Sequence, residues 1–293
     1  WHIISYLRQS AMNAVNSMQS LTESGSLTLM KNNLGQAYIP QFNINGIGNL
    51  LPGQGYQVFL NKTDSLVYPA NEQLKASFRN SFFTPTEAEV LKNSISNTGS
   101  NMTIILEIEN PDNKFELAVF NGNGMITGSA RLIGNLAVLT VWNDDDYISD
   151  KANDRTLRFM AYDKVSASFS DVNCTILNDM IDNGKLTSVS YNDNMIIYAK
   201  GKIEAVKNSL LMTVSPNPFV DKCEVELYVR ESTDGIIKMY NSMGKEVYTK
   251  DTGLLTAGKH IFQISAVGLA SGEYNIIFSG NGKSESLKLI LSK

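Results

Sequence analysis

The side chains best suited to chemistry in this 293-residue sequence are a run of carboxylates, Asp144–Asp146, followed closely by Asp150 and Asp154. Calcium takes about six to eight oxygen ligands, and carboxylates clustered on a loop supply them. The spacing is not that of an EF-hand, because the turn glycine and the closing glutamate are absent. Two interpretations stay open: calcium held by Asp144, Asp145 and Asp146, or a solvated acidic turn after a buried strand ending at Trp142.

Side chains for enzyme catalysis are sparse. The two histidines, His2 and His260, stand in no motif with a partner. The sequence contains no Gly-x-Ser-x-Gly elbow, phosphate-binding loop or His-Glu-x-x-His helix. A glycosidase needs only two carboxylates at the right separation, and 29 Asp and Glu residues leave a cryptic hydrolase open. We expect no enzyme activity.

Aromatic side chains can also form a platform for glycans. Trp142, Tyr147 and Tyr162 are the candidates. The alternative, which we favour, is that Trp142 caps a core and that the tyrosines are half-buried strand residues.

Composition excludes some classes of function. The net charge is −4 and the isoelectric point is near 5.3, and there is no basic stripe, so we expect no nucleic-acid partner. No run of about 18 apolar residues predicts a membrane-spanning helix.

No signal peptide begins at Trp1, so we expect either its removal or a fragment of a longer chain, and favour the fragment. Two cysteines make no disulfide framework, and Cys223 is expected to be a buried hydrophobe.

The elements that must position these residues are mostly strands. Residues 1–70 predict an α+β module, with strands at 1–7, 27–29, 57–60 and 66–68 and a helix over 11–21. Residues 71–98 predict a connector with one helical patch at Thr86–Leu91. Residues 99–207 predict a β-sandwich-like module, with strands at 102–108, 117–120, 136–142, 156–162 and 195–199.

A linker at 208–213, within a hinge at 207–214, leads to a last module at 214–293. Prolines at 216 and 218 fix φ and extend their neighbours. Residues 223–229 alternate apolar and polar, which predicts a strand with one buried face. Further strands are expected at 236–240, 261–264, 274–278 and 287–291, the last two joined by a turn at 280–282. The spacing predicts a small β-sandwich.

This module resembles the type A C-terminal sorting domain of the bacterial type IX secretion system, over the whole last quarter of the chain. The matching stretches are Pro216–Phe219, Met239–Asn241 with Gly244–Val247, Gly258–His260, Leu269–Tyr274 and a terminal strand ending at Lys293. The residues that carry the sorting signal are then Pro216, Asn217, Pro218, Phe219, Gly244, Gly258, Ser271, Gly272, Tyr274, Lys288 and Lys293.

The resemblance implies an immunoglobulin-like sandwich that acts as an address. Its partners are the outer-membrane translocon, the accessory shuttle β-barrel and a cell-surface sortase, and the protein is secreted or displayed on the cell surface. Recognition is expected to use a rigid lead-in at Pro216–Phe219, exposed strand edges and the basic residues Lys288 and Lys293.

The upstream modules resemble repeats found in other cargo of this system. Trp1–Ser5, Lys31–Pro40 and Pro52–Tyr56 carry the likeness in the first module, and Asn101–Thr103, Glu116–Phe120 and Val141–Asp145 carry it in the second. The resemblance assigns them no chemistry. The alternative function is that of adhesion or glycan-binding units of a large surface protein, with calcium as the one cofactor left open.

Overall fold

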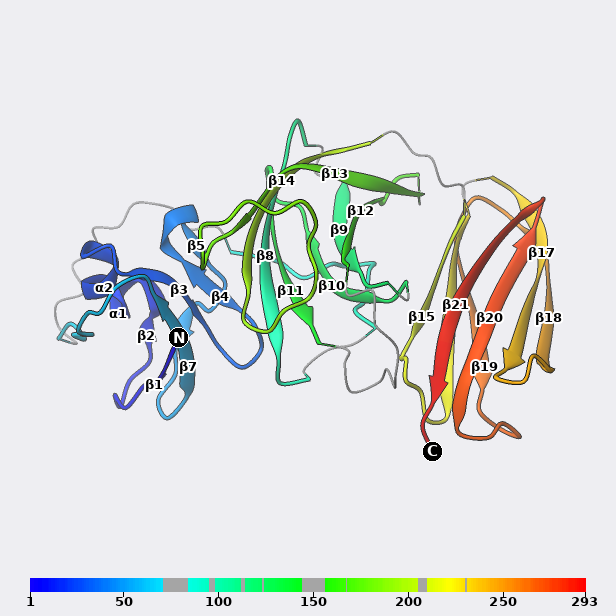
Figure 1. Cartoon of the computed structure of the whole chain (residues 1–293), viewed down its shortest axis with the longest axis horizontal. Coiled ribbons are helices and arrows are strands. Elements are labelled where there is room, and N and C mark those ends of the chain that lie inside the picture. The colour runs from blue at the N-terminus through cyan, green and yellow to red at the C-terminus, as the bar shows by residue number, and fades with distance from the viewer. Residues whose placement is uncertain are drawn as a thin grey trace. The chain divides into compact units, whose positions relative to one another are not determined.

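The structure is a computed structural model of the whole chain (Figure 1), and it describes residues 1–70, 84–94, 98–111, 114–122, 124–143, 156–166, 168–204, 210–229 and 231–293. Strands make up most of these residues, which confirms the predicted mainly β class. The chain divides into two compact units, Trp1–Thr86 and Glu87–Lys293.

The first unit is α+β, with a five-stranded sheet in the order β1-β7-β3-β4-β5 and a small β2-β6 pair. Its elements are β1 (His2–Ser5), β2 (Met12–Asn13), α1 (Ala14–Ser17), α2 (Gln19–Glu23), β3 (Leu27–Lys31), β4 (Ala37–Ile39), a 3-10 turn η1 (Pro40–Phe42), β5 (Ile44–Asn45), β6 (Asn49–Leu50) and β7 (Gly55–Leu60).

Two expectations for this unit need correction. The helix over 11–21 is two short helices, which meet at Met18, where the backbone (φ −99°, ψ 13°) leaves helical geometry. The strand at 66–68 is absent among the described residues. The Val67 N–H donates to the Ser20 hydroxyl (3.1 Å) rather than to a neighbouring strand.

The second unit begins with a seven-stranded sheet in the order β10-β9-β12-β13-β14-β8-β11. Its strands are β8 (Asn101–Ile108), β9 (Phe115–Phe120), β10 (Ile126–Arg131), β11 (Leu136–Trp142), β12 (Arg158–Asp163), β13 (Ser168–Asp179) and β14 (Ile196–Ile203). The beginning of β13 pairs with β12 and the rest with β14, so one long strand joins both halves of the sheet around a shared core. The five predicted strands are present, whereas polar residues hid β10 and β13 from the sequence pattern.

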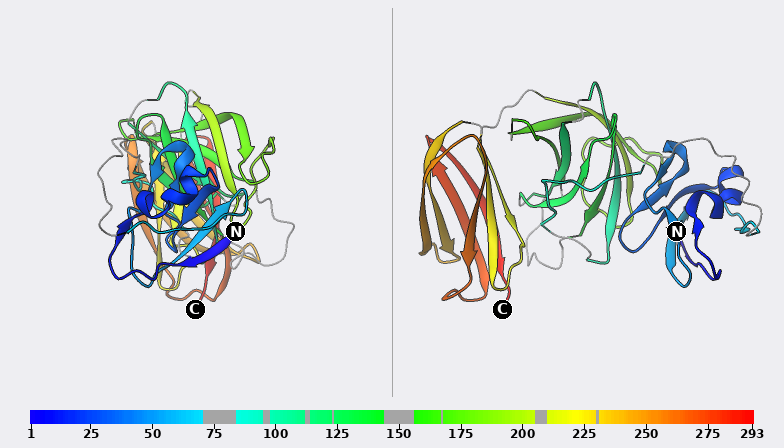
Figure 2. Two further views of the ribbon diagram at one scale, coloured as in Figure 1. Left: turned by 90° about the vertical axis from the view of Figure 1, so that its left-hand side faces the viewer. Right: turned by 180° about the vertical axis from the view of Figure 1, so that it is seen from behind.

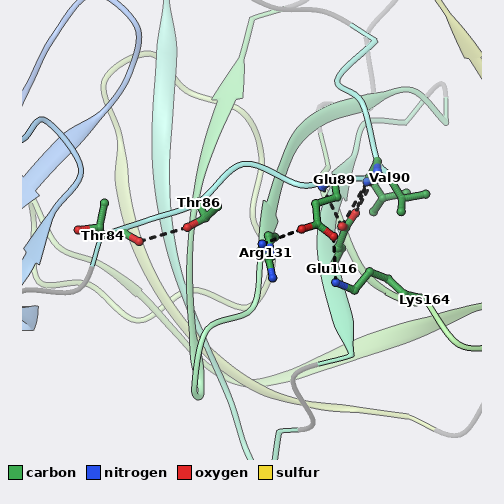
Figure 3. Close-up of polar contacts among 8 residues, drawn as sticks. Thr84, Thr86, Glu89, Val90, Glu116, Arg131 and Lys164 are labelled. Atoms are coloured by element: carbon green, nitrogen blue, oxygen red, sulfur yellow. Dashed lines mark hydrogen bonds and ion pairs between the residues drawn. The ribbon is translucent and has the colours of Figure 1, made fainter.

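The segment before β8 is held by one buried carboxylate (Figure 3). The N–H groups of Glu89, Val90 and Leu91 donate to the two oxygens of Glu116 over 2.8–3.2 Å, and Glu116 is 0% exposed. The predicted helix at Thr86–Leu91 is therefore wrong, because these donors bond to a side chain on β9 instead of following a helical pattern. Around this anchor, Arg131 and Lys164 pair with Glu89 at 2.7 and 3.3 Å.

The C-terminal part of this unit has two sheets, β15-β16-β19 and β18-β17-β20-β21, which share one core (Figure 2). Its strands are β15 (Leu210–Ser215), β16 (Lys222–Val229), β17 (Thr233–Asn241), β18 (Glu246–Leu255), β19 (Gly258–Ser265), β20 (Gly272–Gly280) and β21 (Lys283–Leu291). All five predicted strands are present. Asn281 and Gly282 both have positive φ in the turn between β20 and β21, as a tight hairpin requires.

The expected linker at 208–213 needs correction for its described residues. Residues 210–215 form β15, which pairs along its whole length with β16. Its residues 210–214 are all buried, so this strand lacks the alternation that a strand with one solvent face shows.

Candidate functional site

The two ends of the C-terminal module meet at β21, and the meeting point is the Pro216–Phe219 motif. The Phe219 N–H donates to the Ile290 carbonyl (2.9 Å), and the Ser292 N–H donates to the Phe219 carbonyl (2.9 Å). These two bonds make Phe219 a parallel partner of Leu291. The Phe219 ring is 0% exposed and belongs to the core of the module.

Two residues earlier, the Asn217 side chain makes hydrogen bonds to β21 of the kind that the backbone of a neighbouring strand makes. The Asn217 Nδ2 donates to the Lys288 carbonyl (2.8 Å), and the Ile290 N–H donates to the Asn217 Oδ1 (2.8 Å). A residue of a parallel strand opposite Leu289 would bond these same two groups. Asn217 is 2% exposed and Phe219 is 0% exposed, so within the rigid lead-in these two side chains face the interior of the module. Pro216 is exposed and Pro218 is half-buried.

The end of the chain is tied to the loop before β20. The Lys293 Nζ donates to the Leu269 carbonyl (2.8 Å), and its backbone N–H donates to the Ser271 hydroxyl (3.3 Å). The buried Tyr274 donates its hydroxyl hydrogen to the Ala270 carbonyl (2.6 Å). These contacts bring Ser271, Tyr274 and Lys293 together.

Two further predicted residues belong to this region, Gly272 beside β21 and Lys288 on it. Gly272 pairs with Leu291 in the β20–β21 ladder. Lys288 forms an ion pair with Glu273 (2.6 Å), so its charge already has a partner at the surface.

The remaining predicted residues, Gly244 and Gly258, lie elsewhere. Gly244 (φ +75°) closes the exposed turn between β17 and β18, where its N–H donates to the Asn241 carbonyl (2.9 Å). Gly258 begins β19. The two glycines lie beyond opposite ends of β18, which has ten residues and is therefore about 33 Å long. The predicted residues therefore form no single cluster.

A group that the sequence did not indicate lies on the outer face of β16. The Tyr228 hydroxyl donates to the Glu226 carboxylate (2.6 Å), which also pairs with Lys259 (2.6 Å). The rings of Tyr162 and Phe169, from β12 and β13, pack edge-on against the Tyr228 ring with centroids 5.1 and 5.0 Å away. This face of the C-terminal module is therefore covered by the preceding module.

Burial sets the protonation of these tyrosines. It raises the pKa of Tyr228 far above its usual range, with the Glu226 carboxylate as the next cause. Burial, followed by the charges of Glu116 and Glu226, raises the pKa of Tyr162 to about 12. Both rings keep their protons at neutral pH. The sequence signals for this cluster were Tyr228, an aromatic residue on the polar side of β16, and Tyr162, a candidate for a glycan platform or for a half-buried strand residue.

Other candidates take more ordinary places. Asp144, Asp145, Asp146 and Tyr147 lie outside the described residues. Trp142 and Tyr162 are 5% and 3% exposed, as core residues are, so neither presents a ring face for a glycan. Both cysteines are free, and burial raises the pKa of Cys174 to about 11 and that of Cys223 to about 12.

Two further observations on the described residues concern metal ions and membrane-spanning helices. The described residues contain no group of three or more His, Cys, Asp or Glu side chains placed to hold a metal ion. In the described parts of the chain, no helix has both the length and the apolar character that a membrane crossing needs.

Comparison with known proteins identifies the module around this site. Residues 213–292 match the family described as the secretion system C-terminal sorting domain. The C-terminal module is a sorting domain of this class, and its system is the type IX secretion system. The chain is therefore a protein exported across the outer membrane, to the cell surface or the medium.

The other comparisons add no such assignment. No curated protein matches the sequence. The BSP domain of a biofilm-associated protein is 13% identical over 63% of this chain and 26% of that one (TM-score 0.22). A β-glycosidase from Bacteroides vulgatus is 8% identical over 66% and 25% (TM-score 0.22). Dimeric latent PorU from Porphyromonas gingivalis is 10% identical over 99% and 29% (TM-score 0.25). The chain thus spans about a quarter of the length of these structures, and TM-scores this low assign neither fold nor function.

Proposed function

We propose that the folded C-terminal module is what the outer-membrane translocon and its shuttle β-barrel recognise, and that a cell-surface sortase acts on it after export. One observation carries this proposal: the match to the sorting-domain family coincides with a module that has its own core. Because Asn217 and Phe219 are buried, they contribute to recognition by holding the fold. Contact falls to exposed positions, among them Pro216, Gly244 and Ser271.

Deletion of residues 210–293 tests the proposal in a bacterium with an active type IX system. We expect the truncated protein to accumulate in the periplasm, measured by cell fractionation and immunoblotting. An unrelated β-sandwich of similar size, placed after residue 209, is the control for loss of a stabilising neighbour, and it should also remain in the periplasm. Normal export of either protein contradicts the proposal.

We also propose that residues 1–204 travel as passenger modules without enzyme activity. In support, His2 is the one histidine of residues 1–204 and lies on the short strand β1, and the other histidine, His260, lies in the sorting domain. Hydrolysis of glycan or ester substrates by the purified chain, abolished by substitution of a pair of neighbouring carboxylates, would contradict this.

A further inference from the structure

The C-terminal end of the β21 edge is closed by groups that do not belong to a strand. Adjacent backbone groups of a strand point to alternate sides, so the side of β21 away from β20 presents the Lys288 carbonyl, the N–H and carbonyl of Ile290 and the Ser292 N–H. The carboxamide of Asn217 bonds the first two of these groups, and the backbone of Phe219 bonds the other two.

The closing segment is itself a poor template for another strand. Both backbone groups of Phe219 face β21, so those of its neighbours face away, and Pro218 has no N–H to offer. Pro216 likewise lacks a donor. Prolines at a sheet edge stop the addition of further strands.

An open β21 would pair readily. It is a nine-residue strand with buried leucines at 287, 289 and 291, and it lies at the end of its sheet. A strand with these features pairs well with its own copy across a two-fold axis, because the same groups meet in both directions.

We propose that Pro216–Phe219 is an edge plug, whose function is to stop a second copy of this chain from adding its β21 to the same sheet. Asn217 is the positioning residue of the plug, and Phe219 is its anchor in the core. The plug keeps the sorting domain monomeric before export. The proposal goes beyond the sorting role, and its test needs no export machinery.

The test uses the purified full chain. In Asn217→Ala both carboxamide bonds to β21 are lost, together with the bond from Nδ2 to the Met125 sulfur (3.2 Å). We therefore expect exchange of the Ile290 amide hydrogen to accelerate at least about tenfold, the effect of losing one net hydrogen bond of about 1.4 kcal/mol. In light scattering after size exclusion, the mass should rise from one chain to two as concentration increases. Asn217→Ser keeps a neutral hydroxyl that can bond one of the two β21 groups, so both changes should be smaller.

Asn275→Ala is the matched control, because Asn275 is exposed on β20 opposite Lys288. It should change neither readout. If Asn217→Ala unfolds the module, amides of β16 accelerate equally, and the milder Asn217→Ser then decides by the same two readouts. An Asn217 variant that folds and stays monomeric at every concentration overturns the proposal, even if Ile290 exchanges faster.

Discussion

The two outer strands of the four-stranded sheet in the sorting domain are treated differently. The chain closes the C-terminal end of the β21 edge with Asn217 and Phe219, and the preceding module covers the nearby face of β16. β18 pairs with β17 alone among the described residues and has exposed side chains at 249 and 250. We call these the closed side and the open side. In the function proposed above, the motif named by the family resemblance acts by completing the fold, and partners use the open side.

The largest expected effect is on the closed side. Phe219→Ala removes a ring that is 0% exposed, which costs about 3–5 kcal/mol for a buried phenylalanine. Val220→Ala, at the next position and 57% exposed, should change stability by less than about 0.5 kcal/mol. Hydrogen exchange at β16 amides measures both, and equal effects would remove the distinction between anchor and neighbour.

Proline substitutions compare the two edges directly. Ile290→Pro removes the N–H that Asn217 accepts and leaves a buried acceptor unpaired, at roughly 2–3 kcal/mol. Adjacent N–H groups of β18 point to opposite sides, so one of Thr249 and Lys250 has its N–H on the free edge. Proline at that one position should lower the unfolding free energy by less than about 1 kcal/mol. Thermal unfolding of the three variants checks this. If both β18 prolines lower the unfolding free energy as much as Ile290→Pro does, the backbone N–H groups on the outer edge of β18 are not free as described.

The packing of Tyr162 against the covered face of β16 should lose stability at high pH. Burial raises the pKa of Tyr162 from 10.0 to about 12. A group whose pKa is higher in the folded state contributes stability below its unfolded pKa, and that contribution is lost as the pH rises through the folded pKa. We expect a loss of about 2–3 kcal/mol from Tyr162 between pH 10 and 12.

Tyr162→Phe should lessen the fall in unfolding free energy as the pH rises, measured by denaturant titrations at pH 9–12. The matched variant Tyr248→Phe changes a half-buried tyrosine in β18 on the open side, whose pKa is raised by burial and then by the nearby Cys223 thiol. It should leave the Tyr162 contribution in place. An unchanged slope in Tyr162→Phe would show that this ring stays accessible to hydroxide in the folded chain.

The smallest effect is expected in the exposed turn on the open side. Gly244 has φ +75°, and a Cβ there meets no atom within 4 Å, so only backbone strain opposes substitution. Gly244→Ala should cost about 1 kcal/mol, and Gly244→Asn less, since asparagine tolerates this conformation. Thermal unfolding measures both, and equal losses would point to a steric cause instead.

Local patterns predicted the strands that have one polar face and the hairpin at Asn281–Gly282. They missed β15, because the preceding module covers the outer side of this strand and leaves no alternation to detect. The sequence also singled out Asn217 and Phe219 as part of a rigid lead-in, but it did not indicate where in the fold they lie. Their partners on β21 lie about 70 residues further along the chain, and no local pattern shows such a pairing.

The measurement that tests the account most directly is export of the full chain carrying Phe219→Ala or Val220→Ala in a bacterium with an active type IX system. If the signal is a completed fold, the Phe219 variant remains in the periplasm and the Val220 variant reaches the medium or cell surface as the unaltered chain does. Export of the Phe219 variant at the unaltered level, with its sorting domain shown to be unfolded, would contradict the account.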